Sequence, residues 1–332
     1  MIDLHLHLDG SLSEEDFKIL SKVSNIPLGD DFPNNIHVPS DCPSLESYLE
    51  RFELPLKFLQ EKEYLTYAIS SLINRLYEQG LIYAEIRFAP QLHLLNGLTQ
   101  EEVTEAVVNG LKEALKDKPD FNANIILCCM RQADEHTNLE TVEVANKFKG
   151  NKVVAIDLAG PEALYPSTHY INVFNKAKEY GLNIIIHAGE ACGSDEIMRS
   201  IDMGAKRIGH GVHLSLDPLT INRVINNNIT FEFCPTSNLQ TKSLKTYQDV
   251  PIMDFIRYGI KVTVNTDNMT VSNTTIVDEY KHLYHTFHLR KDEVYHLLYT
   301  AIQASFTSEI EKLELVKALM NKIDGFYAKI IT

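Results

Sequence analysis

Short apolar runs recur along the chain, and each is followed by a turn residue and then by a helical pattern of apolar positions. Alternating or β-branched runs bounded by Gly, Pro, Asn or Asp predict strands, whereas a period near 3.6 residues predicts amphipathic helices. Clear helical patterns cover Glu101–Lys116, Leu139–Phe148 and Tyr170–Tyr180. The predicted strands are Ile2–Leu8, Ile82–Phe88, Ala123–Met130, Val153–Ala159, Asn183–His187, Arg207–Gly211, Thr230–Cys234 and Lys261–Asn265.

Strands that alternate with helices in this way predict an α/β fold of the (β/α)8 TIM barrel type, with a doubly wound open sheet as the alternative. The stretch Ser11–Gly80 is largely helical and is longer than a simple crossover, and the tail from Thr275 onward is also helical. We therefore expect extra helices after the first strand and at the C-terminus. Because no linker or low-complexity tract divides the sequence, residues 1–332 are expected to form a single domain.

Polar and ionisable residues gather at the C-terminal ends of the predicted strands. In a barrel these ends converge on one mouth, where barrel enzymes carry out their chemistry. An open sheet would hold the first and eighth strands apart, so the barrel is the simpler account. The residues concerned are His5, His7 and Asp9 on the first strand, Gly160 after the fourth, His187 and Glu190 at the fifth, His210 at the sixth and Asp267 at the eighth.

The overall composition narrows the class of protein. The formal net charge of -14 argues against a general nucleic-acid surface, because phosphate binding needs clustered Lys and Arg, but it leaves uncharged nucleosides open. No apolar run approaches the ~20 residues that cross a bilayer. The N-terminus shows no basic region followed by a long apolar stretch, so we expect no signal peptide. The 5 cysteines form no Cys-x-x-Cys pair and are interpreted as reduced thiols. We expect a cytoplasmic protein with no membrane partner.

His5 and His7 lie two positions apart in an alternating strand that also contains Asp3 and Asp9. Residues with this spacing share one side of a strand, so all four side chains should point into the barrel interior. Two buried imidazoles are costly unless something uses their nitrogens, and a divalent metal is the simplest answer. The alternative is a pair of hydrogen-bonded core histidines.

The segment Ile184–Glu190 ends a β-branched strand at His187 and continues through a small Ala-Gly turn. The small residues let the backbone curl so that Glu190 faces the same mouth as His187. A carboxylate beside a metal but not bound to it can shuttle protons. Taken alone, the segment is better explained by a Glu at the start of the next helix, where it is favourable to the helix dipole.

His210 lies between Gly209 and Gly211 at a strand end, and this arrangement suits close approach of backbone or ligand. A His that fills a tight turn is an equally good explanation. The last strand ends in Asn265–Asn268, where Asp267 is either a turn residue or a ligand.

Together with His5, His7 and His187, Asp267 completes a set of three nitrogens and one oxygen. These ligands suit zinc, with iron, cobalt or manganese as less favoured metals, and one further position can hold water. Cys234 is a possible soft ligand, but its apolar strand context favours a core thiol.

Several of these segments, taken in order, resemble the adenosine deaminase family of the amidohydrolase superfamily. Each segment alone is a weak signal, whereas the ordered set is specific and covers essentially the whole chain. The segments are His5–Ser11, Asp157–Glu162, His187–Glu190, Gly209–Gly211 and Asn265–Asn268, with weaker matches at Glu85–Pro90 and Ala304–Phe306.

The resemblance implies zinc-dependent hydrolytic deamination of adenosine and 2′-deoxyadenosine to inosine and ammonia in purine salvage, with one Zn²⁺ per chain. His5, His7, His187 and Asp267 would bind the zinc. Glu190 would protonate purine N1, and His210 together with Asp267 would orient and help deprotonate the metal-bound water. Substrate contacts would come from Asp9 on a ribose hydroxyl, from the backbone of Gly160 on purine N3, and from His7.

The family commonly shows two adjacent aspartates where this chain has Asp267 and Asn268. The second carboxyl of that pair faces purine N7 in the family and must be protonated to donate there, whereas an Asn amide donates at any pH. We therefore predict that Asn268 keeps the N7 contact.

The predicted helix Ser44–Leu54 carries an apolar face, for which core packing is the default interpretation. The resemblance implies instead that this face forms a hydrophobic lid over the nucleoside. Its apolar residues are Leu45, Tyr48, Leu49 and Phe52.

Three alternatives remain open. A deaminase of adenine or of a 5′-modified adenosine would share most of the site. A hydrolase of phosphoesters or cyclic amides often has a Lys at a strand end for a second metal, and no such Lys is found here. A catalytically dead binding protein would have lost a ligand or Glu190. We expect a small-molecule purine nucleoside as partner and a monomer or homodimer.

Overall fold

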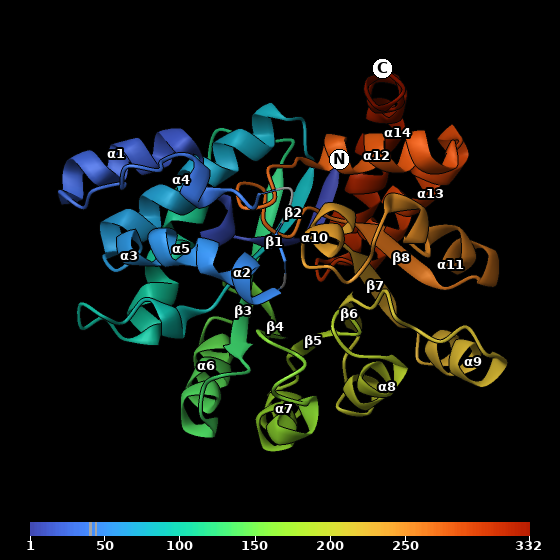
Figure 1. The fold of residues 1–332 in the computed structure, drawn as a ribbon, viewed down its shortest axis with the longest axis horizontal. Helices are drawn as coiled ribbons and strands as arrows, with labels where there is room; N and C mark the ends of the chain where they lie inside the picture. Colours follow the sequence, from blue (N-terminus) through green and yellow to red (C-terminus); the bar gives the residue numbers. More distant parts are fainter. Residues whose placement is uncertain (40–41, 44) are drawn as a thin grey trace.

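The computed structural model describes residues 1–39, 42–43 and 45–332. Its parallel strands pair in chain order from β1 to β8, and helices surround them (Figure 1). This arrangement confirms the predicted (β/α)8 barrel. The strands are β1 (Ile2–His7), β2 (Tyr83–Phe88), β3 (Asn122–Met130), β4 (Val153–Ala159), β5 (Asn183–Ala188), β6 (Arg207–His210), β7 (Thr230–Phe233) and β8 (Lys261–Val264).

The first strand and the segment after the last strand are joined directly. Leu6 pairs with Asp267 in a parallel bridge. The backbone N–H of His7 donates to the carbonyl of Asp267 at 2.7 Å, and the N–H of Asp267 donates to the carbonyl of His5 at 2.8 Å. The open-sheet alternative is therefore wrong, because its first and last strands would lie apart.

Four of the predicted strands extend one residue too far, at Leu8, Gly211, Cys234 and Asn265. Each of these residues directly follows the last residue of its strand, although Leu8 and Asn265 still donate to carbonyls of the neighbouring strands at 2.9 Å. A strand pattern in the sequence does not mark the end of the strand, because the residues there remain buried.

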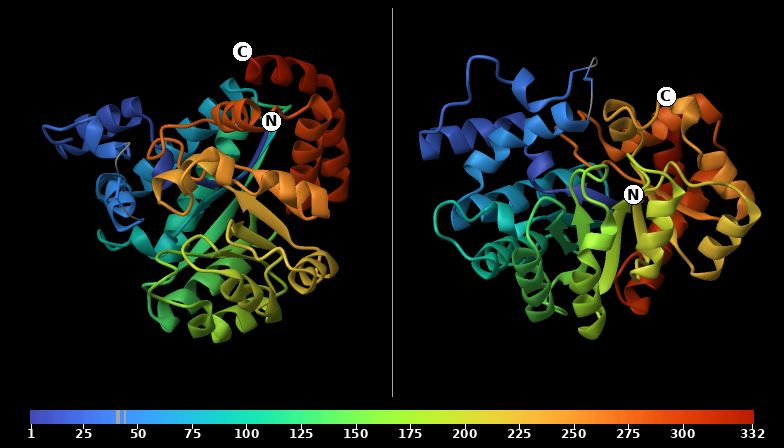
Figure 2. Two further views of the ribbon diagram at one scale, coloured as in Figure 1. Left: turned by 45° about the vertical axis from the view of Figure 1, so that its right-hand side comes forward. Right: turned by 60° about the horizontal axis from the view of Figure 1, so that its bottom comes forward.

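The helices between the strands lie on the outside of the barrel (Figures 1 and 2). The three predicted with explicit bounds correspond to α5 (Gln100–Leu115), α6 (Glu135–Lys147) and α7 (Ile171–Glu179). Helix α6 begins earlier than predicted because Asp134 caps it by accepting from the N–H of Thr137. The remaining ones are α8 (Ser194–Asp202), α9 (Pro218–Asn226), α10 (Pro235–Gln240) and α11 (Ile252–Tyr258).

Extra helices occur at both predicted places. After β1 the chain forms α1 (Glu14–Ser24), α2 (Leu45–Leu49), α3 (Glu53–Phe58) and α4 (Lys62–Glu78). After β8 it forms α12 (Ile276–Phe287), α13 (Lys291–Ala304) and α14 (Glu309–Ile330). None of the helices in the described residues is both long and apolar enough to span a membrane.

The single helix predicted over Ser44–Leu54 is wrong. Ser44 lies outside the described residues, and the chain then forms α2, a 3-10 turn at Glu50–Phe52 and the start of α3. Pro55 lies in the first turn of α3 and has no N–H for the carbonyl of Arg51. A continuous helix would lose that bond, so the chain breaks just before the proline.

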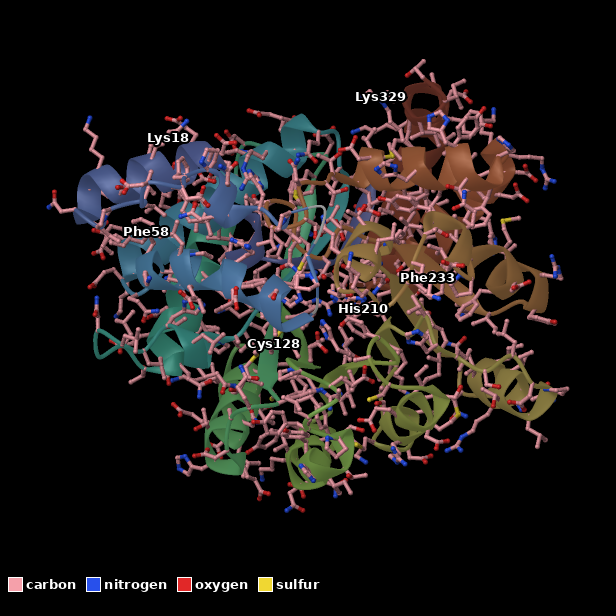
Figure 3. All side chains as sticks on the ribbon, in the orientation of Figure 1. Lys18, Phe58, Cys128, His210, Phe233 and Lys329 are labelled. Carbon is pink, nitrogen blue, oxygen red and sulfur yellow. The ribbon has the colours of Figure 1, made fainter. Side chains whose placement is uncertain are left out.

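The core fills the space between the barrel and its helices. Phe58 and Phe233 lie within the packed interior, whereas Lys18 and Lys329 extend from the outer surface (Figure 3). Cys128, Cys129, Cys192 and Cys234 are free thiols. Cys234 is fully buried, as expected for a core residue.

Candidate active site

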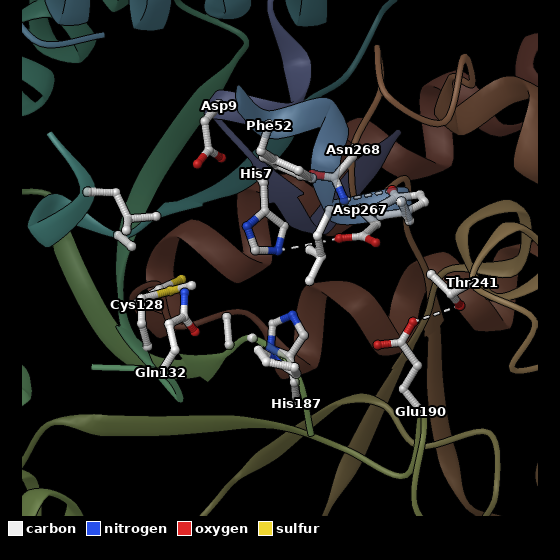
Figure 4. Close-up of a pocket in the computed structure, with 18 of the residues that line it drawn as sticks. His7, Asp9, Phe52, Cys128, Gln132, His187, Glu190, Thr241, Asp267 and Asn268 are labelled. Carbon is white, nitrogen blue, oxygen red and sulfur yellow. Dashed lines mark hydrogen bonds and ion pairs between the residues drawn. The ribbon is translucent and has the colours of Figure 1, made fainter. Parts of the chain in front are cut away.

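One cavity of about 220 Å³ opens at the C-terminal ends of the strands (Figure 4). Most of the candidate residues from the sequence line it, and His5 lies directly beside it with its ring 5.5 Å from that of His7. The side chain of Leu45 lies outside the described residues. The candidates that line the cavity are His7, Asp9, Tyr48, Leu49, Phe52, Gly160, His187, Glu190, His210, Asp267 and Asn268.

Three histidines and one aspartate at this mouth form a cluster suited to a metal ion. Ligand atoms of His5, His7, His187 and Asp267 all lie within 4.8 Å of one another. Oδ1 of Asp267 is 3.4 Å from Nε2 of His5 and 3.4 Å from Nε2 of His7. Zinc bonds to N and O are ~2.1 Å long, and in a tetrahedral site two ligand atoms with such bonds lie about 3.4 Å apart. The observed distances match this separation.

Burial and neighbouring charges leave His5, His7 and Asp267 in forms that suit a metal. Nε2 of His5 is buried and makes no hydrogen bond. Burial lowers the pKa of His5 and holds the pKa of His7 well below its ordinary value, which keeps both rings neutral. Burial alone would raise the pKa of Asp267, but the neighbouring histidines outweigh it and lower that pKa. Neutral imidazoles and an ionised carboxylate are the forms that coordinate a cation.

Carboxylates behind two of the histidines orient the rings. Nδ1 of His5 lies 2.8 Å from Oε2 of Glu232, and Nδ1 of His187 lies 3.0 Å from Oδ2 of Asp157. Arg87 bridges these carboxylates at 2.6 Å from Asp157 and 2.8 Å from Glu232. Burial opposes ionisation of both, yet Arg87 and the histidines hold both pKa values below their ordinary range. Such partners fix the tautomer and the direction of a ligating ring.

Backbone conformation brings two of the candidates to the mouth. His210 has φ +60° and Asp267 has φ +62°, a left-handed region that costs a non-glycine residue about 1 kcal/mol or more. Gly209 provides space for the rings, because a Cβ there would lie 3.0 Å from Cε1 of His5 and 3.2 Å from Cγ of His187.

Glu190 faces the cavity without belonging to the histidine cluster. Its turn is held by Glu162, whose carboxylate accepts from the N–H groups of four successive residues, 189 to 192, at 2.6–3.1 Å. Oε1 of Glu190 accepts from the hydroxyl of Thr241 at 3.0 Å (Figure 4). Oε2 lies 3.6 Å from Nε2 of His210. Both groups are thus available to a ligand at the cluster.

His210 and Asp267 also have partners on α10. Nδ1 of His210 lies 3.0 Å from Nδ2 of Asn238. The hydroxyl of Ser237 donates to Oδ2 of Asp267 at 2.6 Å, which leaves Oδ1 to face His5 and His7. These contacts hold each group in one orientation.

Apolar side chains and one carboxylate form the rest of the cavity. Asp9 is buried, and burial raises its pKa to about 6. Its Oδ1 accepts from the N–H of Gly10 at 3.1 Å, and the carboxylate lines the cavity, where it has further acceptor capacity for a ligand. The apolar wall comes from Tyr48, Leu49, Phe52, Leu56, Leu92, Cys128 and Met130.

Asn268 is held by the α2 segment. Its Nδ2 donates to the hydroxyl of Tyr48 at 2.9 Å, and this hydroxyl lies 2.8 Å from Oγ of Ser272. The amide packs against Gly10, where a Cβ would lie 2.0 Å from Oδ1 of Asn268. One amide hydrogen of Asn268 remains for a ligand in the cavity.

Several residues of this site were missed from the sequence. Glu232, Glu85 and Arg87 are charged residues within apolar strands, and this pattern was a usable signal of an interior ion network. Asp157 and Glu162 lie in a segment that matched the family but received no role. For Gln132, Ser237, Asn238 and Thr241 the sequence offers no signal, because polar residues in a loop or short helix are ordinary.

Comparison with known proteins gives a consistent result. The model of the family described as "Adenosine deaminase" matches residues 1–322. A protein named adenosine deaminase from Haemophilus ducreyi is 42% identical over 339 residues, covering 100% of this chain and 97% of its own length. One of the same name from Clostridium botulinum is 44% identical over 329 residues, covering 97% of both chains.

Among solved structures, adenine deaminase from Arthrobacter aurescens is similar with a TM-score of 0.89. The similarity covers 97% of this chain and 98% of that chain, at 23% sequence identity. At that identity the similarity shows a shared fold.

Proposed function

Because the chain belongs to the adenosine deaminase family, we propose that it hydrolyses adenosine to inosine, and 2′-deoxyadenosine to 2′-deoxyinosine, with release of ammonia in purine salvage. The observation that carries the proposal lies in one cavity: a cluster of three histidines and one aspartate faces a carboxylate, Glu190, that stays outside the cluster. This is the arrangement that metal-assisted hydrolysis with separate proton transfer requires.

The metal proposed for the cluster is one Zn²⁺ per chain, held by His5, His7, His187 and Asp267. Three imidazoles and a carboxylate suit zinc, and the 3.4 Å separations fit its bond lengths. When bound, zinc would act as a Lewis acid and lower the pKa of water toward about 7.

The protein groups divide the proton transfers between them. Glu190, as the neutral acid, donates its proton to purine N1, which draws electron density from C6. His210 and Asp267 hold the attacking water against C6 and accept its proton. The C6–N bond then breaks, and the amino group leaves as ammonia with that proton. The remaining hydroxyl proton returns to Glu190 as the C6 carbonyl of the product forms. The Glu190 and Asp267 carboxylates both face the cavity from separate positions, and this supports the division (Figure 4).

The rest of the cavity would recognise the nucleoside. Asp9 accepts a hydrogen bond from the ribose 5′-hydroxyl, beside His7. The backbone of Gly160 donates to purine N3, and the free amide hydrogen of Asn268 donates to N7. Tyr48, Leu49 and Phe52 cover the base as a lid, a role supported by their position on the cavity wall.

The charge of the cavity favours a nucleoside over a nucleotide. Among the described residues that line it there is no Lys or Arg, while Asp9 and Glu190 both contribute carboxylates. A 5′-phosphate would meet the Asp9 carboxylate without a compensating cation, which is unfavourable in a buried site.

The residues that line the cavity come from positions 7 to 268 of the chain, and this supports a single catalytic domain. The buried free thiols Cys128, Cys129 and Cys234 support a reducing, cytoplasmic location.

The ultraviolet absorbance of adenosine, followed with purified protein, tests the proposal. We expect conversion to inosine, loss of conversion after chelation, and recovery on addition of Zn²⁺. Activity that survived complete metal removal would contradict the metal site. Glu190→Gln should retain metal and fold but lose most activity, and near-normal turnover in this variant would rule out the proton-transfer role.

A substrate panel distinguishes the alternatives. Adenosine, 2′-deoxyadenosine, adenine and 5′-methylthioadenosine are compared by kcat/KM. Adenosine should give the highest value, followed closely by 2′-deoxyadenosine. A higher value for adenine or 5′-methylthioadenosine would show that another 6-aminopurine is the substrate.

A further inference from the structure

Helix α10 presents polar side chains to all three acid–base groups of the cavity. The helix begins at Pro235, whose fixed φ and missing N–H suit the first helical position. It leads directly from β7 back across the barrel mouth. The three pairs are Ser237 with Asp267, Asn238 with His210, and Thr241, at the C-cap of the helix, with Glu190.

The contact between Thr241 and Glu190 makes the two carboxyl oxygens different. Oε1 accepts from the Thr241 hydroxyl at 3.0 Å within the protein. The other oxygen is directed toward the cavity interior (Figure 4). This Oε2 lies 3.6 Å from Nε2 of His210. Thr241 is 8% exposed and Glu190 is 9% exposed, so little water competes for this hydrogen bond.

We assign the hydrogen of the Thr241 hydroxyl to Oε1 of Glu190, at 3.0 Å, because a carboxylate oxygen accepts more strongly than a neutral hydroxyl such as that of Ser243. Oγ of Ser243 lies 2.9 Å from Oγ1 of Thr241 and can supply the hydrogen bond that Thr241 accepts. The carbonyl of Asn238 is 3.5 Å away, too long for a strong bond. The Thr241 hydrogen is therefore directed at Oε1 of Glu190, so this oxygen acts as an acceptor.

We propose that Thr241 is a positioning residue that keeps the acidic proton of Glu190 on Oε2, where it faces the substrate. This inference rests on the proton-transfer role of Glu190 proposed above. With Oε1 occupied as an acceptor, the proton of the neutral acid resides on Oε2. In the transfer, the Oε2–H bond breaks, its electron pair stays on Oε2, and the proton forms the N1–H bond of the purine.

Without the hydroxyl, the carboxyl group gains rotational freedom and a second protonation site. Both reduce the fraction of bound complexes in which the proton points at N1. Since Thr241 acts on the reacting geometry, its loss should lower kcat more than it raises KM.

The test compares Thr241→Val, which removes the hydroxyl at nearly constant volume, with Thr241→Ser, which keeps it. Thr236→Val is the matched control, because Thr236 lies on the same helix and its hydroxyl contacts Tyr247 outside the cavity. In zinc-loaded enzyme we expect Thr241→Val to lower kcat about 10- to 100-fold, the usual range for orienting partners. KM and metal content should change less than threefold, and both Thr241→Ser and Thr236→Val should stay within threefold of the wild-type kcat.

A double-mutant cycle separates this role from a structural one. If Thr241 acts through Glu190, adding Thr241→Val to Glu190→Gln should lower the residual rate by less than twofold. A further loss equal to that in the wild-type background would overturn the proposal. So would a change confined to KM, which would instead indicate direct contact between Thr241 and substrate.

A second pair keeps the test decisive if the valine variant folds poorly. Thr241→Ala and Thr241→Ser differ only by the hydroxyl, and the serine variant should be at least fivefold faster in kcat. Equal rates would overturn the role of the hydroxyl. Failure of the proposed function gives a different result: Glu190→Gln would then keep its activity, whatever the Thr241 variants show.

Discussion

Nδ1 of His5 lies 2.8 Å from Oε2 of Glu232, which leaves Nε2 of the same ring facing the metal cluster. Glu232 comes from β7, two strands away from β1 around the closed barrel, and is fully buried. It also contacts Arg87 at 2.8 Å and Arg207 at 2.6 Å, so it links ligand orientation to the ion network below the site. Metal binding and folding stability therefore both depend on the Glu232 side chain.

We expect Glu232→Gln to weaken metal binding roughly 10- to 100-fold, the usual cost of losing an orienting carboxylate. The free energy of unfolding should fall by about 3–5 kcal/mol, because two buried arginines lose an ionised partner. Competition with a chelator measures the metal affinity, and denaturant unfolding measures the free energy of unfolding. Glu279→Gln, another buried carboxyl, is the control and should retain metal affinity. Unchanged affinity in Glu232→Gln would show that the His5 contact does not orient the ligand.

Asp9 should recognise the 5′ end of the ribose. We expect Asp9→Ala to lower kcat/KM for adenosine and 2′-deoxyadenosine about 10- to 100-fold, the contribution of a hydrogen bond to a charged group. The same variant should change kcat/KM for 5′-deoxyadenosine less than threefold, because that substrate lacks the hydroxyl. Steady-state kinetics with the three nucleosides provides the check. Equal losses on all three would place Asp9 in a general structural role.

The Asn268 amide should make N7 recognition independent of pH. In Asn268→Asp the new carboxyl can donate to N7 only while protonated. Activity of this variant should therefore fall, relative to wild type, as pH rises through the pKa of the new group. Burial beside Asp267 should raise that pKa.

The ratio of variant to wild-type kcat/KM between pH 5 and 9 measures the effect. Asn273→Asp, on an exposed position of the same loop, is the matched control and should give a flat ratio. A flat ratio for Asn268→Asp as well would mean that position 268 does not donate to the purine.

Glu279 should reduce stability at alkaline pH. Burial raises its pKa to about 7, and its carboxyl accepts from Thr236 and Thr274. Its ordinary value is 4.5, so the folded state holds the proton more tightly than the unfolded state. The stability associated with that proton is fully present below pH ~4.5 and is lost as pH rises through about 7.

Glu279→Gln carries a neutral amide at any pH and should lose this dependence. Between pH 5 and 8 the free energy of unfolding of wild type should fall by about 2–3 kcal/mol relative to the variant. Denaturant unfolding of both proteins at the two pH values, with equal metal content, gives the comparison. Parallel changes in the two proteins would show that Glu279 is ionised at pH 7.

Much of the fold and of the candidate site could be predicted from the amino-acid sequence. The barrel followed from the alternation of strand and helix patterns, and the family followed from short motifs in a fixed order; both are confirmed. The metal cluster was predicted from the spacing of His5 and His7 and from polar residues at the ends of later strands, and those side chains do lie together. The predicted roles in catalysis and substrate binding stay predictions.

The helix over Ser44–Leu54 shows where local patterns mislead. Its apolar spacing was correct in that Tyr48, Leu49 and Phe52 face the cavity, but the α-helix gives way to a 3-10 turn at Glu50–Phe52, before Pro55. Side-chain periodicity reports which face is buried, and it is insensitive to a missing backbone donor.

The sequence by itself determined the order of the elements and the position of the reactive residues at the strand ends, because strand alternation and turn chemistry act between near neighbours. Only the tertiary structure decided which partners hold those residues. Glu232 lies 227 positions from His5, Thr241 lies 51 from Glu190 and Tyr48 lies 220 from Asn268. Such contacts exist only once the barrel has closed, since closure brings residues from distant strands and loops to a single mouth.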